Sequence, residues 1–193
     1  MVRNGGFEQD AHGDCPWTSI TPPHWGNWIG NYIVKGCTGS TFVYNGCSNC
    51  DGMGMLKYEG DYFIQLHGDC QITAKGPFNQ EIDGIVDGQT YDISFTAAAR
   101  PRSGNSFLFV KIDGETVFTT NVLPDDNTWR QYSFVYTAAS NEGSINLGFS
   151  HCRGGRDGVR CILTDGTDVS DNVGWGSSPF IDDVHVFGRA SKY

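Results

Sequence analysis

SFLFVKIDGETVFTT, residues 106–120, contains two runs rich in β-branched and aromatic residues, and Asp113-Gly114 joins them. An Asp-Gly pair between two such runs is the strongest short-range signal for a β-hairpin, because both turn residues must adopt positive φ. The stretch therefore predicts two antiparallel strands joined by a two-residue turn.

Strand-like runs continue on both sides of this hairpin. A second turn signal, Asp87-Gly88, divides residues 80–99 into two strands, and no helical pattern persists for three turns anywhere in the chain. The other runs are YFIQLHG (62–68), WRQYSFVYTA (129–138), SINLGFSH (144–151) and FIDDVHVFG (180–188). This order predicts an all-β chain forming one domain, residues 1–193, with two sheets packed as a jelly-roll β-sandwich.

The composition excludes several classes of partner. The chain has 13 basic and 22 acidic residues, a net charge of −9. We therefore expect no binding to nucleic acid or to an anionic membrane surface, both of which need clustered positive charge.

No run approaches the ~18 apolar residues of a membrane-spanning helix. Met1 is followed directly by a strand-like run, and we expect a removed leader to have preceded it.

Seven cysteines lie in polar, glycine-rich stretches. This placement favours disulfides in an oxidising, extracellular compartment, so we expect a secreted protein. Cys152 and Cys161 flank a short loop and are the candidate local pair. The odd count leaves one thiol that is free or paired with a second copy of the chain. Cys47 and Cys50 have zinc-knuckle spacing, but no second pair stands at a recognised distance.

Two segments lack the strand pattern. Residues 11–57 carry four cysteines and three tryptophans, and residues 151–179 carry two more cysteines and Trp175. Long irregular segments inside a compact domain are usually functional. Both are therefore expected to be loops that hold a binding site.

Five stretches together resemble a known family. NGGFE, YEGDYFIQLHG, GQTYDISFTAAAR with VKIDGETV, WRQYSFVYTA and FIDDVHV occur in this order. They are similar to the galactose-binding-like jelly rolls, namely the carbohydrate-binding modules of xylanases and cellulases and related plant cell-wall proteins. The resemblance covers residues 3–10 and 58–187. It implies a β-sandwich that binds a glycan or polysaccharide.

The final strand-like run contains a carboxylate. A period-2 pattern places Asp182 on the face of Phe180, Val184 and Val186, where a charge is costly unless something compensates it. The resemblance implies a structural calcium held by Glu8 and Asp182, with Glu59 or Asp61 beside them, since calcium prefers six to eight oxygens. Asp183 is the second choice. The alternative is that Asp182 caps a turn or pairs with an arginine while Glu8 is solvated.

Flat aromatic side chains among polar residues suit sugar rings. The candidate ligand-binding residues are Trp17, Trp25, Trp28, Tyr32, Arg100 and Trp175. The alternative for each tryptophan is that it fills one end of the sandwich. The alternative for Arg100 is that it is a solvated residue at the end of a strand. Gln80 and Glu81 are further cleft candidates, with a solvated strand face as their alternative.

No nucleophile motif, phosphate loop or metal-dependent catalytic motif is present. The sequence therefore predicts a secreted, non-catalytic lectin or carbohydrate-binding module with a structural calcium. One alternative is an extracellular matrix or coat protein that assembles through disulfides and aromatic loops. Another is a polysaccharide hydrolase or lyase, because fold alone does not decide function.

Overall fold

The computed structural model describes thirteen stretches of the chain: residues 1–10, 17–18, 24–26, 32–35, 58, 60–66, 78–100, 104–126, 128–139, 143–151, 162–163, 165–172 and 178–189. Its strands are β1 (Trp17–Thr18), β2 (Tyr32–Lys35), β3 (Tyr62–Gln65), β4 (Phe78–Asp83), β5 (Thr90–Ala98), β6 (Leu108–Ile112), β7 (Glu115–Thr119), β8 (Arg130–Thr137), β9 (Ser144–His151) and β10 (Phe180–Gly188). Two 3-10 turns, η1 (Glu8–Asp10) and η2 (Ser170–Asn172), complete the described elements.

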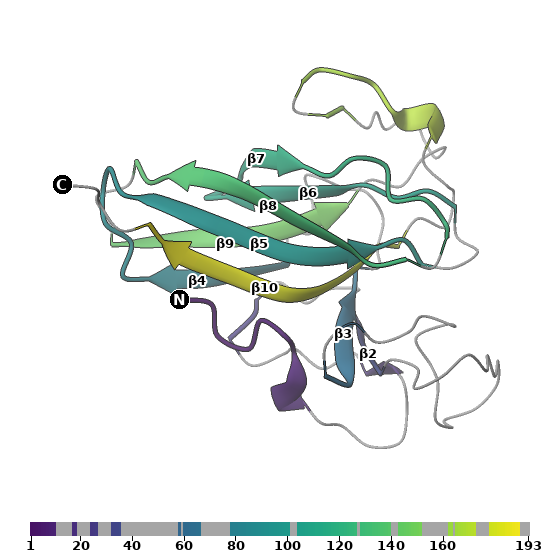
Figure 1. Cartoon of the computed structure of the whole chain (residues 1–193), viewed down its shortest axis with the longest axis horizontal. Helices are drawn as coiled ribbons and strands as arrows, with labels where there is room; N and C mark the ends of the chain where they lie inside the picture. The colour runs from purple at the N-terminus through teal and green to yellow at the C-terminus, as the bar shows by residue number, and fades with distance from the viewer. Residues whose placement is uncertain are drawn as a thin grey trace.

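The strands form two antiparallel sheets. Sheet A has the order β1-β2-β3-β10-β5-β8, and sheet B has the order β4-β9-β6-β7. Figure 1 shows the long strands β8, β5 and β10 of sheet A crossing over β9 and β6 of sheet B. This arrangement confirms the predicted all-β sandwich.

The hairpin at 106–120 forms as its turn residues require. Asp113 and Gly114 have φ of 52° and 89°, and β6 and β7 pair from Ile112 opposite Glu115. Positive φ at both central positions is the type I′ geometry that matches the twist of the flanking strands. The turn is also tied to sheet B, because Asp113 Oδ1 accepts a hydrogen bond from the Asn146 backbone N–H at 2.8 Å.

The main core lies between the two sheets and follows the alternation of the strands. On β5, the inward positions Tyr91, Ile93, Phe95 and Ala97 are all buried. Sheet B supplies the facing residues Phe78, Ile82, Leu108, Val110, Ile112, Ile145, Leu147 and Phe149. Three tyrosine and phenylalanine side chains of β8 (Tyr132, Phe134 and Tyr136) are partly buried against this core.

A second, smaller cluster covers the opposite, outer face of sheet A. Phe63 and Phe180 meet edge to face with ring centroids 4.8 Å apart, and Trp129 packs on Phe63 at 5.2 Å. Ala98 completes the cluster. The central strands of sheet A are therefore buried on both faces at this end.

The segment 11–57 is not wholly irregular. It contains β1 and β2, which pair with each other and, through β2, with β3. The expectation of a loop throughout this segment is wrong at these six residues. In the segment 151–179 the described residues include the end of β9, η2 and an isolated bridge between Ile162 and Asp168. Neither helical turn in the described residues is long and apolar enough to cross a membrane.

Candidate functional site

The N-terminal segment packs across both sheets. The side-chain amide of Gln80 on β4 accepts a hydrogen bond from the Arg3 backbone N–H at 2.7 Å and donates one to its carbonyl at 2.8 Å. Two residues later, the Gly5 carbonyl accepts a hydrogen bond from the Val184 N–H of β10 at 3.1 Å. A Cβ on Gly5 would lie 2.1 Å from the Val184 carbonyl oxygen, so only glycine permits this approach.

Glu8 then joins this segment to the start of β3. Its Oε1 accepts hydrogen bonds from the backbone N–H groups of Asp61 and Tyr62, each at 2.8 Å. A Cβ on Gly60 would lie 2.2 Å from the Glu8 carboxyl carbon, and Gly60 also has a φ of +59°. The Glu8 side chain is exposed, and its carboxylate lies over Gly60 in space that a side chain at residue 60 would occupy; we call this position the Glu8 recess.

Asp182 lies on β10 and is fully buried. A β-bulge follows it, in which Asp183 adopts a φ of 52° and donates its backbone N–H to Asp182 Oδ1 at 2.8 Å. The extra residue changes the alternation, so Ile181, Val184 and Val186 belong to the main core while Phe180 belongs to the outer cluster.

The predicted shared face of Asp182, Phe180, Val184 and Val186 is therefore wrong. Asp182 lies on the outer face of sheet A with Phe180, on the side opposite to Ile181. The N-terminal segment lies beside it, because a Cβ on Gly6 would be 4.0 Å from Asp182 Oδ1. The period-2 pattern failed because a bulge cannot be read from it.

These features fit a calcium ion, which takes oxygen ligands from carboxylates and backbone carbonyls. The Asp182 carboxylate lies near Gly6, and the Glu8 carboxylate, two residues further along the same segment, lies near Gly60. Within the described ranges, no group of three or more His, Cys, Asp or Glu side chains forms a ready-made metal site. An ion held here would thus need backbone carbonyls as well as carboxylates.

The outer face of sheet B is polar. The core residues of β4, β6 and β9 alternate with side chains that project to the opposite side of the sheet. We call this set the polar face; it consists of Asn79, Glu81, Lys111, Ser144, Asn146 and Gly148. Asp83 lies at its margin by the same alternation. Phe109 and Ser150 also project to this side, but they are covered: Phe109 is 4% exposed and the Ser150 hydroxyl is buried.

The strand register arranges the polar face in rows that cross the sheet. Asn79 of β4 lies opposite Gly148 of β9, which lies opposite Lys111 of β6. In the neighbouring row Glu81 lies opposite Asn146. Gly148 is buried, and Asn79 and Lys111 on either side of it are half-buried. Glu81 accepts a hydrogen bond from the Ser144 hydroxyl at 3.1 Å, whereas Lys111 makes no ion pair with any residue of the described stretches.

Trp25 is a core residue in the structure. Only 3% of its surface is exposed, and its ring stacks on Phe78 with centroids 4.6 Å apart and an interplanar angle of 10°. Its indole Nε1–H donates a hydrogen bond to the Asn4 carbonyl at 3.2 Å. A ring this buried cannot stack on a sugar, so the structure places Trp25 in the core and contradicts its prediction as a sugar-stacking residue.

The other predicted residues are placed only in part. Trp17 and Tyr32 lie on β1 and β2, and their side chains are outside the described residues, as are Trp28, Trp175, Glu59 and all seven cysteines. Arg100 follows β5 and is half-buried. Asp61 is exposed and meets Glu8 through its backbone N–H.

The polar face contains residues that the sequence analysis missed. Asn79, Lys111 and Asn146 alternate with buried residues on their strands, and this alternation was the available signal. Of the pair Gln80 and Glu81, only Glu81 is on the polar face; Gln80 is buried and binds the backbone of Arg3.

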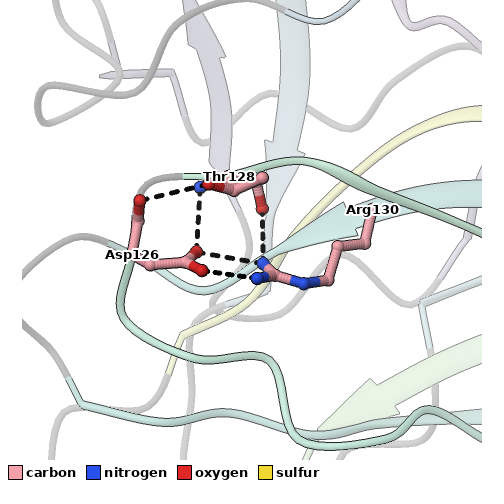
Figure 2. A network of polar contacts seen from close by, with 3 residues as sticks. All are labelled: Asp126, Thr128 and Arg130. Carbon is pink, nitrogen blue, oxygen red and sulfur yellow. Dashed lines mark hydrogen bonds and ion pairs between the residues drawn. The ribbon is translucent and has the colours of Figure 1, made fainter.

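A polar network orders the loop before β8 (Figure 2). The Arg130 guanidinium donates to both carboxylate oxygens of Asp126, with Nη1–Oδ1 at 3.0 Å, and to the Thr128 carbonyl at 3.0 Å. The Thr128 N–H donates to Asp126 Oδ1 at 3.1 Å. The hydrogen bond from Arg130 lowers the pKa of Asp126 and raises that of Arg130. The network holds the chain next to Trp129 and so supports the outer cluster of sheet A.

The comparisons with known proteins agree with this architecture. The family model for a carbohydrate-binding domain matches residues 1–149, and no curated protein sequence matches the chain. Among solved structures, a xylan-binding domain (CBM22-1) of Paenibacillus barcinonensis Xyn10C has a TM-score of 0.54 at 13% identity, covering 97% of this chain and 94% of that one.

Two further solved structures have a similar fold and differ from each other in function. A cyclase from Fischerella sp. TAU has a TM-score of 0.58 at 13% identity, covering 100% of this chain and 98% of that one. TmCBM61, solved with β-1,4-galactotriose, has a TM-score of 0.50 at 16% identity, covering 97% of each chain. At these identities the likeness concerns the fold alone. The match of the family model over residues 1–149, well over half of the sequence, is what shows that this chain belongs to the family of carbohydrate-binding domains.

Proposed function

We propose that this protein is a secreted, non-catalytic carbohydrate-binding protein whose polar face binds the glycan. The observation that carries the proposal is the row of Asn79, Gly148 and Lys111 across three strands of sheet B. Sugars present many hydroxyl groups, and the amide and ammonium groups in this row supply both donors and acceptors.

The backbone beneath the polar face is held by hydrogen bonds and by core packing. Asn146 is held by two hydrogen bonds to Asp113, one from its N–H to the carboxylate at 2.8 Å and one from the Asp113 N–H to its carbonyl at 3.0 Å. The core residues Ile145 and Leu147 flank it on β9. Polar groups fixed on strands lose little conformational entropy when a ligand binds, which favours recognition without rearrangement.

The proposal includes a structural calcium. Glu8 and Asp182 would provide carboxylate oxygens, and the backbone around residues 60–61 would supply carbonyls. Glu59 and Asp61 remain predicted ligands. The ion would neutralise the fully buried Asp182 carboxylate, whose Oδ1 already accepts a hydrogen bond from the Asp183 backbone N–H.

Aromatic residues at the margin of the binding surface complete the proposal. Trp17, Trp28, Tyr32 and Trp175 remain predicted sugar-stacking residues, and Arg100 a predicted hydrogen-bond donor. Stacking plus a few hydrogen bonds gives several kcal/mol, so we expect single-site dissociation constants of about 1 μM or weaker.

The test is a glycan array probed with the oxidised protein, first in calcium and then in EDTA, with xylan and β-1,4-galactan fragments included. We expect binding to a related set of glycans. Lys111→Ala and Asn146→Ala should each weaken it by about threefold to tenfold, the value of one hydrogen bond. Ser133→Ala, an exposed position on sheet A, is the matched control and should bind normally.

A blank array with folded protein would refute the proposal. Reductant-sensitive oligomers in that case would support the matrix-protein alternative, and turnover of a bound polysaccharide would support the enzyme alternative. Binding that is unaffected by both substitutions would preserve the carbohydrate-binding function but place it elsewhere on the molecule.

A further inference from the structure

Trp25 fixes a short segment of chain against the edge of sheet B. Besides stacking on Phe78, its ring lies 5.5 Å from Phe7 and 6.3 Å from Phe149, measured between centroids. Its N–H is bound to the Asn4 carbonyl at 3.2 Å. The indole is therefore held on one side by the sheet and on the other by the N-terminal segment. The backbone of Trp25 therefore has little freedom to move.

The next residue, Gly26, pairs directly with β4. Its N–H donates to the Asn79 carbonyl at 2.6 Å, and the Asn79 N–H donates back at 3.4 Å. Residues directly opposite in an antiparallel pair project to the same face. Gly26 thus extends the row of Asn79, Gly148 and Lys111 by one position, at the open edge of the sheet.

The absence of a side chain at Gly26 determines where the Asn79 amide lies. A Cβ at this position would be 3.2 Å from Asn79 Oδ1, closer than nearly all real contacts of this kind. The Asn79 side chain therefore extends over the Gly26 backbone. A Cβ at position 26 would require the Asn79 amide to shift by a few tenths of an ångström.

We propose that Trp25 and Gly26 are positioning residues for glycan binding, acting through Asn79. Trp25 holds the segment against β4, and Gly26 leaves the space in which the Asn79 amide is oriented toward the ligand. This inference rests on the proposed function of the polar face. It gives Trp25 a part in recognition although its ring is buried and does not touch the sugar.

A double-mutant cycle tests the inference. We would measure the affinities of wild type, Gly26→Ala, Asn79→Ala and the double variant by titration calorimetry with xylohexaose and with β-1,4-galactotriose. Each single variant should bind about threefold to tenfold more weakly. The double variant should bind no more weakly than Asn79→Ala, because both changes remove the same interaction. Asn121→Ala, at an exposed position off the polar face, is the matched control and should bind as wild type.

Two further measurements separate positioning from loss of fold. The Asn79 side-chain amide resonances in an NMR spectrum should shift in Gly26→Ala even without glycan, while the melting temperature stays within a few degrees of wild type. Trp25→Phe keeps an aromatic ring on Phe78 but loses the hydrogen bond to Asn4. It should weaken glycan binding without unfolding the protein.

Additive losses in the double variant would overturn the inference, as would normal binding by Gly26→Ala. So would full binding by Asn79→Ala, and these outcomes would leave carbohydrate binding itself intact. A wild-type protein that binds neither probe nor any glycan of the array would overturn both this inference and the proposed function.

Discussion

In both sheets, side chains along each strand alternate between the main core and an outer face. The outward side chains of the two sheets differ in how far they are buried. On sheet A, Phe63, Phe180 and Asp182 of β3 and β10 are fully buried, with Trp129 packed over them. On sheet B, the corresponding positions of β4 and β9 are occupied by Glu81 and Asn146, which are exposed. Part of the outer face of sheet A is a second core, whereas Glu81 and Asn146 form a polar surface on sheet B.

This difference separates stability from binding. Residues on the outer face of sheet A should matter for folding, because removing them leaves cavities or unpaired charges. Residues on the polar face should matter for a ligand, because exposed polar side chains contribute little to folding. The sandwich can therefore accept changes on one outer face that it would not tolerate on the other.

The largest expected effect comes from emptying the outer cluster of sheet A. Phe180→Ala removes a fully buried ring that contacts Phe63 and Trp129, which should cost about 3–5 kcal/mol of unfolding free energy. At roughly 2–4 °C per kcal/mol, the melting temperature should fall by about 10 °C, as calorimetry would measure.

The control for this prediction is on the same sheet. Val135→Ala changes an exposed outer-face residue of β8 and should alter the unfolding free energy by no more than about 0.5 kcal/mol. Equal losses from Val135→Ala and Phe180→Ala would mean that the outer cluster is not a second core.

A smaller effect is expected from calcium at the Glu8 recess. At a calcium concentration of about 100 times its dissociation constant, binding adds about 2.7 kcal/mol to stability. The melting temperature should then rise by about 5–10 °C relative to EDTA. Glu8→Gln keeps the Oε1 acceptor for the two N–H groups of β3 but removes the charge, so it should lose most of this response.

Glu115→Gln makes the same chemical change at an exposed position of β7 and should keep the full response to calcium. If the wild-type melting temperature were the same in calcium and in EDTA, the recess would not hold calcium, and Glu8 would act only as a hydrogen-bond acceptor for β3.

The smallest effect concerns the ion pair of Arg130 and Asp126. Because the hydrogen bond from Arg130 lowers the pKa of Asp126, the pair stabilises the fold above the unfolded pKa of 3.8, and this contribution is lost as the pH falls through the lower folded value. The pair is partly exposed, so solvent screening limits it to less than about 1 kcal/mol.

Arg130→Gln should therefore lower the unfolding free energy slightly at pH 7, and the difference from wild type should shrink toward pH 3. Urea denaturation at the two pH values measures this. A difference that grows as the pH falls would contradict the assigned direction of the pKa. Lys111→Gln, which removes a cation without an ion pair in the described residues, should show no such pH dependence.

Local patterns predicted much of the fold correctly. The turn at Asp113-Gly114 and the alternation on β5 are properties of neighbouring residues, and both appear in the structure as expected. The family resemblance, carried by ordered short stretches, also agrees with the match over residues 1–149. These signals are strong because φ preferences and period-2 burial act over only a few residues.

The candidate site was predicted less well, for identifiable reasons. Trp25 was assigned to a ligand because it lies in a polar, glycine-rich stretch, but its partners Phe7, Phe78 and Phe149 are distant in sequence. Asp182 was assigned to the wrong face because the bulge at Asp183 depends on pairing with β5. No local window contains either piece of information.

The sequence by itself determined that this is an all-β, acidic chain with a defined hairpin and a set of apolar strands. Only the tertiary structure decided which side of each sheet is covered, because burial depends on the segments that pack from elsewhere in the chain. The N-terminal ten residues show this most directly: they lie against β4, β10 and β3 at once, and so connect both sheets. Strand register then placed Gly26, Asn79, Gly148 and Lys111 in one row, although they are spread over more than 120 positions of the sequence.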